Sequence, residues 1–148
     1  MKLVDPSGDV PIVQMSVYAS QSPDDLFRLG QALRPLRDQN IAIMGSGFAS
    51  YHNLQGMFSG ATSAPGFKGK HSEWTRSLDD AMSTTSTDER GAKLKDWRKW
   101  PYASLMHPPR GAEHFSPLVV CAGAAGEQAA ESWGDEFLGF DNKTYYWK

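Results

Sequence analysis

Two short apolar runs, residues 10–17 and 41–44, frame one helical pattern in the first third of the chain. Both runs are rich in residues that favour strands, and their largely apolar character is typical of strands buried on both faces of a sheet. Between them, Ser22 and Pro23 provide a capping residue and a proline at the first helical position, with two acidic residues in the first turn. The order strand, helix, strand predicts a right-handed β-α-β unit with a parallel sheet.

The remaining sequence predicts further helices around this unit. Residues 55–70 are rich in glycine and small polar residues and predict a long loop, and Pro35 is expected to shorten the end of the first helix. The tail, residues 143–147, has residues typical of an edge strand. Helical patterns cover residues 73–82, 87–97 and 118–125. The predicted fold class is therefore α/β, a mostly parallel sheet with flanking helices, in a single domain over residues 1–148.

Charge and cysteine content narrow the classes of function. The chain has 15 basic and 17 acidic residues and a net charge of −2, which gives no electrostatic drive toward nucleic acid or anionic membranes. No apolar run approaches the roughly 20 residues that a membrane-spanning helix needs. The single cysteine, Cys121, excludes an internal disulfide, and the first residues do not have the pattern of a signal sequence. These features predict a cytoplasmic protein without nucleic-acid or membrane partners.

The run 41–44 leads into two glycines, Gly45 and Gly47, and His52 follows shortly after. Glycines at the end of a strand permit a tight turn with positive φ, and a following imidazole can then point into a crevice above the sheet. The alternative is a loop histidine that only makes hydrogen bonds. The two glycines could also hold a phosphate, although they lack the lysine and the longer glycine pattern of known phosphate loops.

Other histidines and aromatic residues have structural interpretations as well. His107 and His114 are seven positions apart, which is not the helical spacing of a zinc protease, and both could be structural. We expect His71 to be exposed to solvent and Cys121 to be packed in an apolar helix. Basic residues alternate with tryptophans over residues 93–100, as in surfaces that stack on single-stranded nucleic acid, but the acidic net charge favours a solvated helix face.

Taken in order, several short motifs resemble one family. The chain is similar to the C-terminal half of the catalytic domain of class III extradiol ring-cleavage dioxygenases, and most similar to the DOPA-dioxygenase-like branch. The resemblance extends from about residue 10 to residue 126, and it is specific as an ordered set. The matching segments are residues 12–17 (IVQMSV), 29–37 (LGQALRPLR), 43–47 (IMGSG), 52–54 (HNL), 102–103 (YA), 107–108 (HP), 113–118 (EHFSPL) and 123–126 (GAAG).

This resemblance implies a non-haem metal, Fe(II) or Zn(II), and cleavage of a catechol-type aromatic ring by dioxygen. His114 matches the C-terminal metal-ligand histidine of the family. His52 matches an acid–base histidine that is also a metal ligand in some members, and His107 matches a further histidine near the substrate. The implied site residues are thus His52 and His107 for catalysis and His114 and His52 for the metal. Tyr102 and Trp74 are further candidates for contacts with the substrate, although either could serve only in packing.

The chain also departs from the family pattern. The resemblance implies two more ligand histidines in an N-terminal half, but no histidine precedes His52, and the interval from His107 to Glu113 is two residues longer than usual. The start at Met1 predicts a truncated chain that associates with itself or with a missing N-terminal half. Two alternatives to a ring-cleaving enzyme remain: a non-catalytic interaction domain, and a nucleotide-binding module built on the β-α-β unit.

Overall fold

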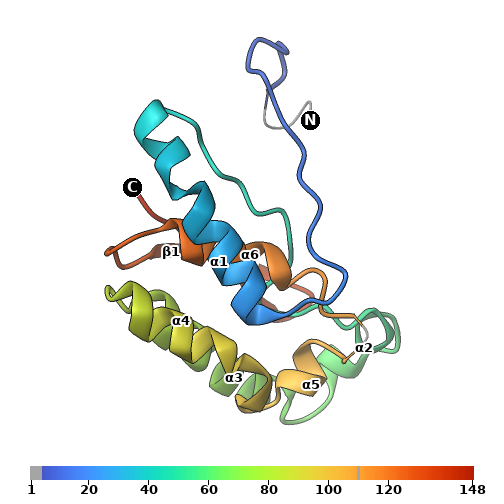
Figure 1. Cartoon of the computed structure of the whole chain (residues 1–148). Helices are drawn as coiled ribbons and strands as arrows, with labels where there is room; N and C mark the ends of the chain where they lie inside the picture. Colours follow the sequence, from blue (N-terminus) through green and yellow to red (C-terminus); the bar gives the residue numbers. More distant parts are fainter. Residues whose placement is uncertain (1–4, 110) are drawn as a thin grey trace.

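The computed structural model describes residues 5–109 and 111–148, which form a mixed α/β structure of helices and one β-hairpin (Figure 1). The helices are α1 (Pro23–Leu33), α2 (Leu54–Phe58), α3 (Phe67–Met82), α4 (Thr87–Lys95), α5 (Ala103–Met106) and α6 (Ser116–Ala124). Three short 3₁₀ helices cover Arg34–Gln39, Ala61–Ser63 and Trp97–Lys99, and the strands are β1 (Glu131–Phe137) and β2 (Phe140–Tyr146). In the described residues, no helix is long and apolar enough to cross a membrane.

The sheet of the described residues is an antiparallel hairpin. Glu131 lies opposite Tyr146, and Phe137 lies opposite Phe140 next to the turn. This confirms the strand predicted in the tail. The predicted parallel sheet is not formed within residues 5–109 and 111–148, because residues 10–17 and 41–44 are extended but pair with no strand there.

The two unpaired runs carry apolar side chains that face solvent. Val13 is 86% exposed and Met44 is 67% exposed. Figure 1 shows the N-terminal segment extending away from the helices. The strand pattern describes each run by itself, but a ladder also needs a neighbouring strand to accept and donate its hydrogen bonds. The predicted β-α-β unit is therefore not formed within the described residues.

Local signals determine where the helices begin and end. The Ser22 hydroxyl accepts a hydrogen bond from the Asp25 N–H, so α1 begins at Pro23 as predicted. Pro35 has the expected effect, since α1 ends at Leu33 and the chain continues as a 3₁₀ helix. The helix predicted over 118–125 is confirmed as α6.

The loop predicted over residues 55–70 was wrong. This segment contains α2 and a 3₁₀ turn, and α3 begins in it at Phe67, well before residue 73. The glycine-rich composition does not predict the start of α3, but Phe67, Trp74 and Leu78 all lie on the buried face of this helix. Their burial against the core outweighs the weak helix propensity of the first turn.

A single core joins the helices. α1 packs directly on α6, where a side chain at Gly30 would come within 2.0 Å of the Val120 carbonyl oxygen. α3 and α4 lie beside this pair (Figure 1). The largest fully buried side chains include Trp74, Leu78 and Phe115. Trp97 is buried as well, which confirms that the tryptophan pattern serves the core and leaves the neighbouring lysines on a solvated face.

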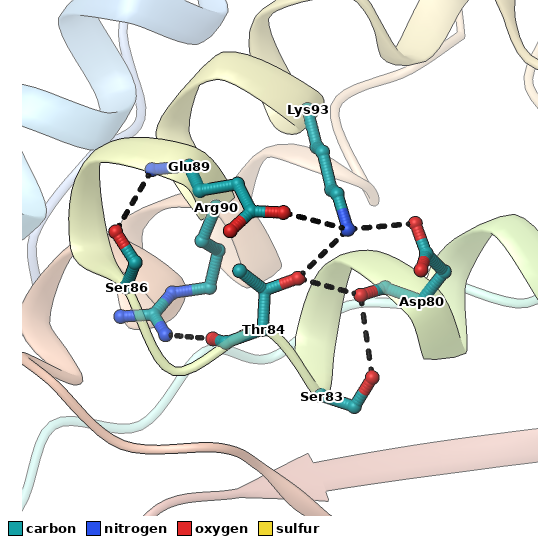
Figure 2. A network of polar contacts seen from close by, with 7 residues as sticks. All are labelled: Asp80, Ser83, Thr84, Ser86, Glu89, Arg90 and Lys93. Carbon is teal, nitrogen blue, oxygen red and sulfur yellow. Dashed lines mark hydrogen bonds and ion pairs between the residues drawn. The ribbon is translucent and has the colours of Figure 1, made fainter.

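Arg90 of α4 is fully buried, and Figure 2 shows its guanidinium next to the Thr84 carbonyl. Its guanidinium donates hydrogen bonds to five backbone carbonyls, those of Thr84, Thr85, Ala122, Gly126 and Gln128. Burial lowers the pKa of this guanidinium. Nearby, Lys93 bridges the Asp80 and Glu89 carboxylates and the Thr84 hydroxyl. The Arg90 hydrogen bonds thus hold three separate chain segments at one point.

Cys121 is packed in α6 against the segment that contains Gly45, as expected of a cysteine in an apolar helix. Burial raises the pKa of its thiol to about 11. At pH 8 only about one thiol in a thousand would be ionised, and the thiolate is the reactive form. We expect a disulfide reagent such as DTNB to label Cys121 far more slowly in the native chain than in denaturant. Equal rates in the two states would contradict this expectation.

Candidate metal centre

The two glycines before His52 allow the backbone to pass very close to the backbone at the start of α6. Gly45 and Gly47 are not among the glycines with positive φ, so the predicted reason for these glycines was wrong. A Cβ at Gly47 would lie 2.2 Å from the His114 carbonyl oxygen, and one at Gly45 would lie 2.7 Å from the Pro117 carbonyl oxygen. Because these two residues have no side chains, the segment 45–47 lies directly against His114 and the first turn of α6.

His52 and His114 lie side by side as a result of this contact. Their imidazole rings stack with centroids 3.6 Å apart and planes inclined by 17°. Each ring is partly buried, and the Nδ1 atom of each is buried without a hydrogen-bond partner in the part of the chain that the structure describes. Burial lowers the pKa of His114, and the adjacent His52 lowers it further. Two adjacent imidazoles that each keep an unused nitrogen atom are suited to binding a metal ion.

Glu113 brings a carboxylate to the same place. One ligand atom from each of His52, Glu113 and His114 lies within 4.8 Å of the other two. Two imidazoles and one carboxylate form a donor set that both non-haem Fe(II) and catalytic Zn(II) use. In the sequence, Glu113 stood out only as part of a motif and was not predicted as a ligand. A carboxylate next to a predicted ligand histidine was the signal that could have identified it.

The segment that carries His52 is held by hydrogen bonds to the segment 105–107. The His52 N–H donates to the Met106 carbonyl at 2.9 Å, and the Asn53 side-chain amide donates to the Leu105 carbonyl at 3.0 Å. The His107 Nε2 lies 2.8 Å from the Ala49 carbonyl oxygen. Residues 49–53 are thus connected to the end of α5 by three hydrogen bonds.

His107 itself is fully buried behind this segment. The rings of Trp74, Trp97 and Phe115 surround its imidazole at centroid distances of 5.4, 5.9 and 5.2 Å. Burial lowers the pKa of His107 to about 4, so the imidazole is neutral at pH 7. The structure therefore places His52 and His114 together and His107 in the aromatic core beneath them.

The remaining sequence candidates lie elsewhere. His71 was expected to be exposed, but it is buried, because the early start of α3 places it on the same buried face as Trp74. Trp74 is fully buried, whereas Tyr102 is partly exposed at the start of α5. In the insertion between His107 and Glu113, Arg110 lies outside the described residues.

Comparison with known proteins identifies the family. Residues 1–143 match the family model described as the catalytic LigB subunit of aromatic ring-opening dioxygenase. The chain belongs to the LigB family. The resemblance to extradiol dioxygenases inferred from the motifs is confirmed by this match.

Three relatives of this LigB-family chain are all named as dioxygenases or as dioxygenase-like. It is 48% identical over 155 residues to dioxygenase tasH of Hapsidospora irregularis, a match that covers 99% of the chain and 47% of the relative. It is 32% identical over 130 residues to a 4,5-DOPA dioxygenase extradiol of Beta vulgaris, covering 87% of the chain and 45% of the relative. A 4,5-DOPA dioxygenase extradiol-like protein of Schizosaccharomyces pombe is 31% identical over 82% of the chain and 39% of the relative. The chain spans about half the length, or less, of these relatives.

The family is one of metal-dependent dioxygenases, and among the described residues His52, Glu113 and His114 form a group that could hold a metal ion. The orphaned Nδ1 atoms of the two histidines fit such a group, because a metal ion would use a buried nitrogen that hydrogen bonding leaves free.

Proposed function

We propose that this chain carries one wall of the active site of an extradiol ring-cleavage dioxygenase that acts on a catechol-type aromatic substrate with dioxygen. The observation that supports this most directly is the convergence of His52, Glu113 and His114 in a LigB-family chain. In this proposal residues 1–148 are the C-terminal portion of the family's α/β domain.

The proposed roles follow from the chemistry of each side chain. His114 and Glu113 hold Fe(II) or Zn(II), and His52 is close enough to be a further ligand. When bound, the metal supplies a Lewis-acidic centre with open positions for other ligands. In its other role, with its basic nitrogen free of the metal, His52 takes the proton that a catechol hydroxyl must lose and later returns it, because imidazole accepts and donates protons near neutral pH. Glu113, which is exposed, also balances the positive charge that His52 then carries.

We propose that the complete site requires a partner surface. Residues 10–17 and 41–44 are extended and expose apolar side chains, and paired with strands from the rest of the domain or from a second copy they would form the predicted parallel sheet. The length of the relatives favours the rest of the domain as the partner. The single free cysteine is consistent with a cytoplasmic setting.

Metal binding tests the proposed site without requiring activity. We expect His114→Ala to weaken Zn(II) binding by at least about 100-fold in calorimetry, since even the loss of a residue that only supports a ligand costs 10–100-fold. The matched control is His71→Gln, which removes a histidine outside the cluster and should bind Zn(II) like the unmodified chain. Equal affinities for the His114→Ala variant and the unmodified chain would refute the assignment.

Activity and assembly are tested separately. Anaerobically loaded Fe(II) protein, given a catechol and then oxygen, should form a yellow ring-opened product if the chain is active alone. No product from the loaded chain would reject autonomous catalysis. The second candidate function, a non-catalytic interaction domain, is favoured by the exposed apolar runs. Light scattering distinguishes it, because a monomer at all concentrations would count against association.

A further inference from the structure

The Ala49 carbonyl lies three residues before His52 and is the point at which the core holds the His52 segment. A carbonyl oxygen has two lone pairs, and both are used here. His107 Nε2 lies 2.8 Å from this oxygen, and the Trp74 indole N–H donates to it at 3.3 Å. Since a carbonyl can only accept, the His107 hydrogen must reside on Nε2. The tautomer of His107 is therefore defined by its partner.

The same geometry leaves His107 poorly suited to acid–base chemistry. Its Nδ1 is buried without a partner among the described residues, and the whole side chain is inaccessible to solvent. Within residues 5–109 and 111–148, the only hydrogen bond of the ring is the one to Ala49. A group enclosed by tryptophan and phenylalanine rings can neither receive a proton from a substrate nor pass one to water.

We infer that His107 is a positioning residue, whose Nε2–H fixes the Ala49 carbonyl and thereby the backbone from which His52 projects toward His114. The inference rests on the proposed function only in so far as His52 serves the metal site. A second hydrogen bond, from the His52 N–H to the Met106 carbonyl, holds the other end of the same segment. The neighbouring residues His107 and Met106 thus fix the two ends of the segment 49–52. The surrounding aromatic rings keep the imidazole in the orientation that this hydrogen bond requires.

The first test uses the metal-free chain and two substitutions. Glutamine can place an amide N–H close to the position of Nε2, whereas phenylalanine fills the space without a donor. In heteronuclear NMR spectra, His107→Phe should shift the backbone amides of residues 49–53 and the ring signals of His52, and His107→Gln should restore both toward the unmodified chain. The unmodified chain should show the Nε2–H tautomer at His107. An Nδ1–H tautomer, or equal shifts in both variants, would overturn the inference.

A destabilised control separates positioning from general loss of stability. Leu94→Ala removes a fully buried apolar side chain of α4. His107→Phe should weaken Zn(II) binding by about 10–100-fold, as expected when a group that orients a ligand is lost. His107→Gln should retain most of the Zn(II) affinity. Leu94→Ala should retain its Zn(II) affinity even where its melting temperature falls as much as that of His107→Phe. If Leu94→Ala loses as much affinity as His107→Phe, the role of His107 is only structural. If the unmodified chain binds no metal, the proposed function fails while the NMR test still decides the inference.

Discussion

Replacement of Arg90 by methionine is expected to lower the free energy of unfolding by about 3–5 kcal/mol, because the loss of a buried hydrogen-bond network is among the most costly effects of a single substitution. The five carbonyls that the guanidinium contacts would lose their donor, and each buried carbonyl left unpaired costs about 1–3 kcal/mol. Because the free energy of unfolding of a protein is only about 5–15 kcal/mol, this substitution removes a large part of the stability. Urea unfolding followed by circular dichroism measures it.

Two further variants make the result specific to the hydrogen-bond geometry. Arg90→Lys keeps the charge, but its compact ammonium cannot reach carbonyls from three segments, so it should be destabilised nearly as much. This variant also provides a measurement if Arg90→Met does not fold. Lys93→Met removes a partly exposed neighbour whose ion pairs contribute at most about 1 kcal/mol. Similar losses for Lys93→Met and Arg90→Met would show that Arg90 has no special role.

Replacement of Gly47 by alanine is expected to separate His52 from His114. The new Cβ would lie 2.2 Å from the His114 carbonyl oxygen, so one of the two backbones must move. Forcing a methyl group into a close-packed contact costs about 1–3 kcal/mol. The ring stacking of the two histidines should be lost, and Zn(II) binding should weaken with it. Calorimetric titration and the histidine ring signals in NMR spectra report the two effects.

Gly69→Ala is the matched control for Gly47→Ala. Gly69 lies inside α3, and a Cβ there meets nothing within 4 Å. Alanine favours a helix over glycine by about 1 kcal/mol, so this variant should be as stable as the unmodified chain or more so, with normal Zn(II) binding. If Gly47→Ala behaves like Gly69→Ala, the close approach of the two backbones is not what brings the histidines together.

Local sequence signals predicted the helices well where they act within a few residues. Ser22 and Pro23 marked the start of α1 correctly, and Pro35 marked its end. The region around Phe67 was misread because its first turn has weak local preference, and only burial against distant residues makes it helical. The parallel sheet is absent from the described residues for a related reason, since strand pairing depends on a neighbour that the local sequence pattern does not reveal.

In the candidate site, too, the sequence identified individual residues but not the contacts between distant segments. The motifs identified His52 and His114, and the structure brings these two rings together. The motifs could not show that His107 is buried, because its surroundings come from α3, the 3₁₀ helix Trp97–Lys99 and the segment that precedes α6. The glycines before His52 were noticed for their backbone freedom, whereas they leave space for the backbones of Pro117 and His114.

The unpaired segment 10–17 also has a consequence for how the protein can be studied. An extended backbone without ladder hydrogen bonds is readily accepted by a protease, and its apolar side chains suit thermolysin. Cleavage there should be fast in the isolated chain and should slow down when another strand covers the segment. The rate of a single cut would then report assembly directly, at concentrations too low for light scattering.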